Sequence, residues 1–365
     1  MRVAIVGGSL GGLACANLLT RLGASVSVFE KSEHTFEKRG ACLGFVDVDM
    51  LQQIRGAPFI RNGRQASLDQ GAFYYGDVWQ FLYTGLPAGT VKFGRTVATL
   101  GEDTKKPSVD GEVYDIAIIA DGGWSTLRVK YIETRVPEYT GHQIIWASVD
   151  TADVPGGLGS FDSAFGSTEM STYTAEGIYD AVVLEAPKCD GTSMYACGFF
   201  IATPENEIVR PEAGDNRQVQ ATRAWTKVPD WFQPFIRKMF AKFVDGDIVR
   251  FTEAAATKGK IAPNPVFEYA AKKTVTDRVV LVGDAAHLST PWTAAGAHTA
   301  ILDAVGLFQA LSSDGASDID RALAAYNKGG VKRADGLLRQ SQACSRRLIP
   351  RWGGKRAVKS PASLI

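Results

Sequence analysis

Arg2-Val-Ala-Ile-Val-Gly-Gly-Ser-Leu-Gly-Gly12 is the stretch that decides the fold. Its first five residues form a short β-branched run, which is typical of a buried parallel strand. Small and apolar residues follow at helical spacing over 13–22, Gly23 ends that helix, and residues 24–30 alternate as a second strand. The N-terminal segment therefore predicts a complete βαβ unit, the start of an α/β fold.

The glycine turn of this unit predicts a bound dinucleotide. Gly7 would make the tight turn, the second position lets backbone amides approach a pyrophosphate, and Gly12 lets the helix pack on the strand. Ser9 occupies the second position, and its side chain is small enough to be tolerated there. Glu30 ends the next strand and is placed to accept hydrogen bonds from ribose hydroxyls, which favours FAD or NAD over NADP. The alternative is a glycine turn that binds no ligand.

Two later motifs have the same strand-then-turn character. One buried strand over 114–120 ends at Asp121-Gly122, and another over 278–282 ends at Gly283-Asp284. The Asp284 carboxylate could accept from a ribityl hydroxyl, and a helix that begins near Gly296 could direct its N–H groups at the N1–C2=O edge of a flavin. We expect His287 to be a packed, hydrogen-bonded loop residue rather than a catalytic base.

The sequence between these motifs has a different residue pattern. Short alternating stretches over 144–253 are separated by Gly, Pro, Ser and Thr and predict an antiparallel sheet. Helices are expected over 296–311, over 317–326 and from 331 onward. The predicted division is a discontinuous Rossmann-type FAD-binding domain (1–60, 88–143 and 263–345), a β-rich substrate domain (61–87 and 144–262) and a flexible basic tail (346–365).

Composition excludes several classes of protein. The chain has 365 residues and a formal net charge of +1, so no global field favours nucleic acid. Five cysteines without a close CxxC pair favour free thiols over a disulfide framework or a metal site. We expect no signal peptide, no membrane-spanning segment, a cytoplasmic location and a monomer or homodimer.

In order and spacing, the three motifs resemble the group A FAD-dependent aromatic monooxygenases, which have the 4-hydroxybenzoate hydroxylase fold. The resemblance covers roughly 1–130 and 275–310, and Thr293-Ala-Ala-Gly296 is similar to the 2,6-dihydroxypyridine hydroxylase branch. Gln80 stands where many relatives carry an arginine, and His298 replaces the usual asparagine. The resemblance implies FAD contacts at Gly7, Ser9, Leu10, Gly12, Glu30, Lys31, Arg39, Gln80, Val97, Asp121, Asp284, Pro291, Gly296, Ala297 and His298.

The resemblance also implies a reaction. NADH or NADPH would reduce FAD, O2 would form a flavin C4a-hydroperoxide, and one oxygen atom would pass to a small aromatic or heteroaromatic ring. Phe45 and Trp292 are candidates to line the substrate pocket, and His298 could deprotonate a ring hydroxyl. For each of the three, plain packing or cofactor contact is the alternative. Two other functions stay open: an FAD-dependent reductase, dehydrogenase or epoxidase with a lipid-like substrate, and a non-catalytic flavoprotein sensor or assembly partner.

Overall fold

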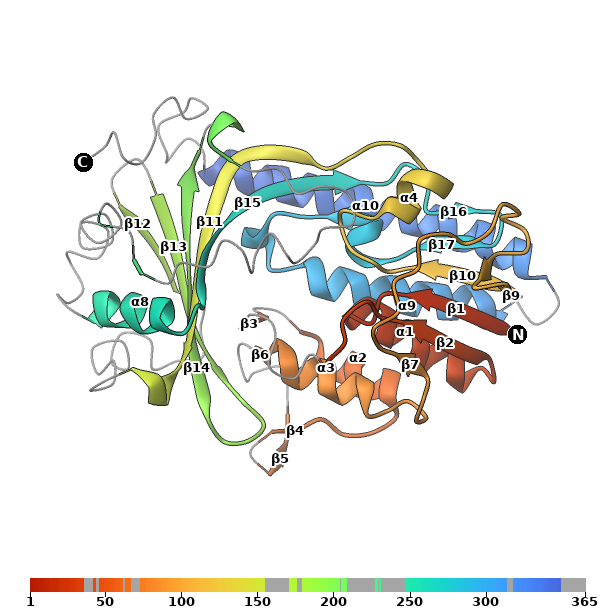
Figure 1. Cartoon of the computed structure of the whole chain (residues 1–365), viewed down its shortest axis with the longest axis horizontal. Coiled ribbons are helices and arrows are strands. Elements are labelled where there is room, and N and C mark those ends of the chain that lie inside the picture. The colour runs from red at the N-terminus through yellow and green to blue at the C-terminus, as the bar shows by residue number, and fades with distance from the viewer. Residues whose placement is uncertain are drawn as a thin grey trace.

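Two six-stranded sheets form the framework of the protein, as the computed structural model shows in Figure 1. The first is mainly parallel and carries all three nucleotide motifs, and the second is antiparallel. The structure describes residues 1–35, 42–43, 46–61, 63–66, 73–154, 171–175, 179–203, 205–208, 227–228, 230, 247–313 and 318–348.

The parallel sheet has the strand order β16-β17-β10-β1-β2-β7, and only β16 runs antiparallel to its neighbour. Apolar side chains cover both of its faces, which explains why three of its strands, over 2–6, 116–119 and 279–281, read as almost continuous apolar runs. The strands are β1 (Arg2–Val6), β2 (Ser25–Phe29), β7 (Val91–Lys92), β10 (Ile116–Ile119), β16 (Val275–Thr276) and β17 (Val279–Leu281).

Helices pack mainly against one face of this sheet. Their apolar sides form the largest core cluster, in which α1 contacts both α3 and α9. The helices are α1 (Leu10–Arg21), α2 (Val48–Arg55), α3 (Tyr75–Tyr83), α9 (Gly296–Ser313) and α10 (Ile319–Leu348), with the short α4 (Thr126–Tyr131) on the other face.

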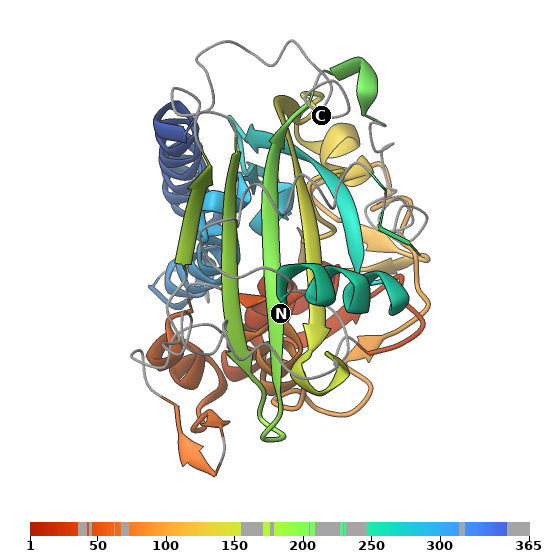
Figure 2. The same ribbon diagram turned by 90° about the vertical axis from the view of Figure 1, so that its left-hand side faces the viewer.

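The antiparallel sheet has the order β12-β13-β14-β11-β15-β18. Helix α8 (Asp247–Thr257) lies on the face turned away from the parallel sheet (Figure 2). Strands β11 and β15 are long and curve from this sheet toward the parallel one (Figure 1). The strands are β11 (Glu138–Asp150), β12 (Ser171–Ala175), β13 (Tyr179–Pro187), β14 (Ser193–Ala202), β15 (Ile261–Ala270) and β18 (His287–Leu288).

Three two-stranded sheets and two 3₁₀ turns complete the described elements that matter for the site. The small sheets are β3 (Cys42–Leu43) with β6 (Phe73–Tyr74), β4 (Ile60–Arg61) with β5 (Arg64–Gln65), and β8 (Ser108–Val109) with β9 (Glu112–Val113). The turns are η4 (Gly283–Ala285) and η5 (Pro291–Thr293). The α/β fold predicted from the sequence, with a Rossmann-type sheet, an antiparallel sheet and a helical C-terminal part, is confirmed.

One predicted boundary was wrong. The sequence suggested separate helices before and after residues 327–330, whereas α10 is continuous over 30 residues. Gly330 lies against the segment before β16, where an added Cβ would be 2.7 Å from the Thr274 hydroxyl oxygen. Asn327 fastens the same contact, because its side-chain oxygen accepts from the Thr274 amide at 2.8 Å. The glycine at position 330 therefore allows close packing on Thr274 within a continuous helix.

Candidate functional site

A cavity of about 580 Å³ lies at the carboxyl ends of β1, β2, β10 and β17. In open α/β sheets this edge is where ligands bind, because the turns after the strands meet the N-termini of helices there. Residues from both ends of the chain line it. They include Val6, Gly7, Phe29, Glu30, Ala120, Asp121, Val282 and Gly283, which end or directly follow the four strands.

The glycine turn after β1 is built for close backbone approach. Gly7 has φ 111°, and a Cβ there would lie 2.2 Å from the Ala120 carbonyl oxygen. A Cβ at Gly12 would lie 2.0 Å from the Gly7 carbonyl oxygen. Side chains at these two positions are therefore excluded by backbone atoms, which are not free to move aside. This cradle fits a ligand that is held by backbone N–H groups, such as a diphosphate.

The N-terminus of α1 faces this cavity without a side-chain cap. Ser9 is the N-cap residue, yet within the described chain its hydroxyl makes no capping hydrogen bond to α1. The first turn, Leu10-Gly11-Gly12, has no acidic residue that could neutralise the positive end of the helix dipole. The first N–H groups of α1 are therefore suited to an anionic ligand.

Glu30 lies at the far side of the same turn. Its carboxylate is 4% exposed and accepts from the backbone amides of Gly8 and Ser32, each at 2.8 Å. A carboxylate offers about four lone-pair positions, so these contacts fix the group and leave acceptor capacity for ribose hydroxyls. The predicted role of Glu30 is compatible with its position in the cavity wall.

The opposite end of the cavity is formed by η4, η5 and the start of α9. Asp284 lines the cavity, and its side chain is exposed there. The protein packed around the cavity reduces the solvation of this carboxyl group and raises its pKa, and the nearby His287 partly opposes the rise. Ala294 adopts a left-handed conformation (φ 51°) that ends η5 and turns the chain into α9 at Gly296. The Asp284 carboxylate and the N-terminus of α9 therefore lie in the same wall of the cavity.

A buried charged network holds η4 in place. The Asp303 carboxylate, 1% exposed, accepts from the Gly283 amide at 2.9 Å, from His287 Nε2 at 2.7 Å and from Arg333 Nε at 2.7 Å. Burial lowers the pKa of His287, but the charge and hydrogen bond of Asp303 outweigh it and raise this pKa overall. His287 is therefore a packed, hydrogen-bonded residue, as we predicted.

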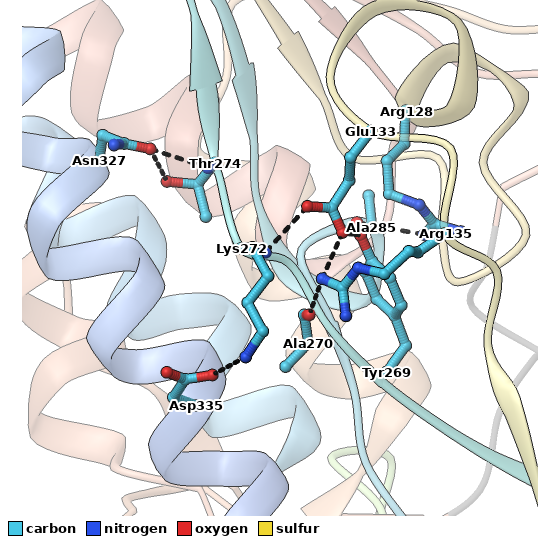
Figure 3. Close-up of polar contacts among 10 residues, drawn as sticks. All are labelled: Arg128, Glu133, Arg135, Tyr269, Ala270, Lys272, Thr274, Ala285, Asn327 and Asp335. Carbon is cyan, nitrogen blue, oxygen red and sulfur yellow. Dashed lines mark hydrogen bonds and ion pairs between the residues drawn. The ribbon is translucent and has the colours of Figure 1, made fainter.

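A second polar junction lies at the end of β15, next to η4 (Figure 3). The buried Arg128 donates to the Ala285 carbonyl at 3.2 Å, and its guanidinium lies 4.2 Å from the centre of the Tyr269 ring. Glu133 accepts from the Tyr269 hydroxyl and from Arg135. This junction joins α4, β15 and η4, so it positions the Asp284 turn relative to the antiparallel sheet.

Asp121 follows β10 and lines the cavity. Burial raises its pKa to about 6, while a hydrogen bond with Ser125 and the charges of Arg128 and Lys31 oppose the shift.

No cluster of His, Cys, Asp and Glu suitable for a metal ion occurs among the described residues. In the same part of the chain, no helix is both long enough and apolar enough to cross a membrane.

Most of the predicted cofactor residues meet in this one cavity. Those that line it are Gly7, Ser9, Leu10, Gly12, Glu30, Lys31, Val97, Asp121, Asp284, Pro291, Gly296 and Ala297. Gln80, Trp292 and His298 do not line it among the described residues, and Arg39 and Phe45 lie outside the described residues. Sequence reasoning missed Tyr75, Arg95 and Trp124 as wall residues. Tertiary packing brings Tyr75 to the cavity, whereas Trp124 closely follows the Asp121-Gly122 turn and could have been found from that motif.

Trp292 lies on the side of η5 that faces the antiparallel sheet. Its ring packs edge-on against Phe200 at 5.4 Å and against His142 at 5.8 Å, from β14 and β11. Burial lowers the pKa of His142 to about 4, so this imidazole is neutral at pH 7. The surrounding cluster consists of Cys42, Tyr74, Ile144, Trp146, Ala186, Met194, Ala196, Phe200 and Val266. This largely apolar cluster packs against η5.

His298 lies in the first turn of α9, two residues after Gly296. Its burial lowers its pKa, and the charge of Asp47, the N-cap residue of α2, partly opposes this effect. The imidazole is therefore predominantly neutral at pH 7, with a basic nitrogen.

The cradle, the uncapped helix and the Asp284 turn define the chain as a dinucleotide-binding protein of the Rossmann type. Comparison with protein-family models identifies the family of this chain. A model described as an NAD(P)-binding Rossmann-like domain matches residues 5–39, and one described as an FAD binding domain matches residues 115–341. The chain therefore belongs to the FAD-binding domain family, and the predicted FAD cofactor is confirmed.

Relatives extend over most of the chain. It is 25% identical over 390 residues to 6-hydroxynicotinate 3-monooxygenase from Pseudomonas fluorescens, covering 93% of this chain and 90% of the relative. It is 26% identical over 414 residues to the FAD-dependent monooxygenase SAT7 from Stachybotrys chartarum, covering 94% and 82%. The predicted resemblance to FAD-dependent aromatic monooxygenases is confirmed.

A solved structure shares the fold. The 2,6-dihydroxypyridine-3-hydroxylase from Arthrobacter nicotinovorans superposes with a TM-score of 0.71 at 16% identity, over 99% of this chain and 95% of that one. At this identity the likeness concerns the fold, and both sheets are included in it.

Proposed function

We propose that the protein is an FAD-dependent monooxygenase that uses NAD(P)H and O2 to hydroxylate a small hydroxylated aromatic or heteroaromatic ring. One observation carries the proposal. Motifs from both ends of the chain line a single cavity, and this cavity ends at η5, which packs against the antiparallel sheet through Trp292. The activities of 6-hydroxynicotinate 3-monooxygenase and 2,6-dihydroxypyridine-3-hydroxylase support the substrate class.

FAD supplies the redox chemistry, taking electrons from NAD(P)H and activating O2. In our assignment Gly7, Ser9 and Gly12 hold the diphosphate, and Glu30 accepts from the adenosine ribose. Asp284 accepts from a ribityl hydroxyl. The N–H groups at the start of α9, beside Gly296 and Ala297, stabilise negative charge at the edge of the reduced ring.

The substrate is assigned to the end of the cavity where η5 meets the antiparallel sheet. Trp292 supplies an aromatic surface there, and the neutral His142 and the apolar cluster around it favour packing against a planar aromatic ring. Residues 61–87 and 144–262 were predicted to form the substrate domain, and the second of these segments contributes β13 and β14 to this side. The cytosol suits the five cysteines, which are all free thiols.

His298 is the proposed base for the ring hydroxyl. Its lowered pKa leaves the imidazole neutral and able to accept a proton near pH 7. The His298→Asn variant should hydroxylate about 100-fold more slowly. The wild-type rate should fall as the pH drops through the lowered pKa of His298, and the variant should lack this limb. An unchanged rate and pH profile would exclude His298 as the base.

The proposed function is tested with purified FAD-loaded protein, NADH or NADPH, and 18O2. The ring compounds are 6-hydroxynicotinate, 2,6-dihydroxypyridine, salicylate and uric acid. We expect at least one to stimulate NAD(P)H oxidation and to gain one 18O atom, measured by mass spectrometry. Stimulated NAD(P)H oxidation without 18O incorporation would favour a reductase or dehydrogenase. A yellow protein that never oxidises NAD(P)H would favour a sensor.

A further inference from the structure

Helix α3 places a tyrosine against the residue that departs from the dinucleotide fingerprint. The Ser9 hydroxyl oxygen lies 2.7 Å from the Tyr75 hydroxyl oxygen, and both residues line the cavity. The two residues are 66 positions apart in the chain, so only tertiary packing brings them together. Tyr75 is the first residue of α3 and lines the cavity. We had predicted that Gln80, on the same helix, would contact the cofactor.

Two contacts hold α3 in the position that this pairing needs. Trp79 lies one helical turn after Tyr75 on the same face, is fully buried, and donates from Nε1 to the Gly8 carbonyl at 2.7 Å. Asp77 accepts from the Cys189 amide at 2.7 Å, in the turn between β13 and β14. The first turn of α3 is thus attached both to the Gly8–Ser9 turn and to the antiparallel sheet.

The direction of the Ser9–Tyr75 hydrogen bond follows from hydroxyl chemistry. A phenol, with an ordinary pKa of about 10, is a stronger acid than an aliphatic alcohol and is therefore the better donor. Ser9 then accepts from Tyr75 and keeps its own proton for another acceptor. Among the described residues the Ser9 oxygen accepts no capping hydrogen bond from an N–H group of α1, so the helix does not fix the orientation of this hydroxyl.

We infer that Ser9 donates a side-chain hydrogen bond to the diphosphate of FAD, and that Tyr75 is the positioning residue that orients this hydroxyl. The inference deepens the proposed function and rests on it. A glycine at this fingerprint position provides only backbone contact. Here the hydroxyl adds a donor at the uncapped start of α1, and a hydrogen bond to a charged oxygen is among the stronger ones in proteins.

The test uses apoprotein reconstituted with FAD and four variants: Ser9→Gly, Tyr75→Phe, the double variant and Tyr83→Phe. Tyr83 is the matched control, because it lies on the same helix and stacks on Trp79 at 4.7 Å without lining the cavity. Ser9→Gly keeps the turn, since glycine is the residue that this position of the fingerprint prefers. FAD affinity is measured by fluorescence titration, and the diphosphate of bound FAD is observed by 31P NMR.

We expect Ser9→Gly and Tyr75→Phe each to weaken FAD binding by about 10-fold and to shift the 31P resonances at saturating FAD. The double variant should be no weaker than Ser9→Gly alone, and Tyr83→Phe should match the wild type. Wild-type affinity and 31P positions in both single variants would overturn the inference. So would an equal additional loss from Tyr75→Phe in the Ser9→Gly background. Failure of the wild-type protein to bind FAD would instead contradict the proposed function.

Discussion

The parallel and antiparallel sheets both have six strands, but they contribute to the site through different parts of the chain. The parallel sheet contributes mainly turns: Gly7, Asp121 and Gly283 come where β1, β10 and β17 end. The antiparallel sheet contributes one face, on which His142 and Phe200 meet Trp292. We therefore propose that turn geometry governs binding of the cofactor, and that side-chain packing governs binding of the substrate.

This difference has a physical basis. Parallel strands end together at one edge, so short turns and helix N-termini converge there and present backbone donors. An antiparallel sheet offers alternate side chains along each strand, and its surface changes with every substitution on that face. Mutations in the two sheets should therefore affect FAD binding and substrate binding separately.

The largest expected effect is at Gly12. In the Gly12→Val variant the new side chain would meet the Gly7 carbonyl oxygen, which a Cβ would already approach to 2.0 Å. We expect a loss of about 4–5 kcal/mol or more in the free energy of unfolding, together with loss of bound FAD. Thermal unfolding and flavin absorbance of the purified protein measure both quantities.

Gly336→Ala is the matched control for this substitution. Gly336 is an exposed residue of α10, and a Cβ there would have no other atom within 4 Å. Alanine should stabilise the helix by about 0.5–1 kcal/mol without changing flavin content. Normal stability and flavin content in Gly12→Val would refute the close-packed turn.

Asp303→Asn should have the next largest effect. It removes the buried charge that faces His287 and Arg333, and we expect a loss of about 3–5 kcal/mol in the free energy of unfolding. Burial alone would raise the pKa of Asp303, but its two cationic partners lower it below the ordinary 3.8. Its stabilisation is therefore present above pH 3.8 and is lost as the pH falls through the lowered pKa.

His287 gives the opposite dependence. Its pKa is raised above 6.5, so its stabilisation is present below pH 6.5 and is lost as the pH rises through the raised value. The difference between wild type and Asp303→Asn should thus be largest between pH 3.8 and 6.5, measured by denaturant unfolding. A difference independent of pH would contradict the network. The control Asp320→Asn removes an exposed partner of Arg278 and should change stability by about 0.5 kcal/mol or less.

The smallest effect on the fold is expected at Trp292. Trp292→Ala removes the ring contacts with His142 and Phe200, so the KM for the ring substrate should rise about 10-fold while FAD affinity stays unchanged. Steady-state kinetics and FAD titration separate the two quantities. Trp124→Leu is the mirror variant, because Trp124 lines the cofactor cavity, and it should weaken FAD binding instead. If Trp292→Ala weakened FAD binding as strongly as Trp124→Leu, the two sheets would not divide the roles as described.

The sequence by itself determined the cofactor side. The strand, glycine turn, helix and second strand of residues 2–30 are consecutive in the chain, so local spacing predicts both their structure and their ligand. The Gly283-Asp284 turn and the start of α9 at Gly296 were predicted for the same reason. Backbone geometry of this kind depends on glycines at particular positions, which a sequence shows directly.

Tertiary structure alone decided the rest. Tyr75 contacts Ser9 across 66 residues, Trp292 of η5 packs on Phe200 of β14, and Gly330 packs against Thr274 within a continuous helix. The physical reason is that each contact depends on how whole elements pack, and spacing along the chain carries no record of that packing. Periodicity locates an element and its apolar face, but the partner across that face is set by the assembled core.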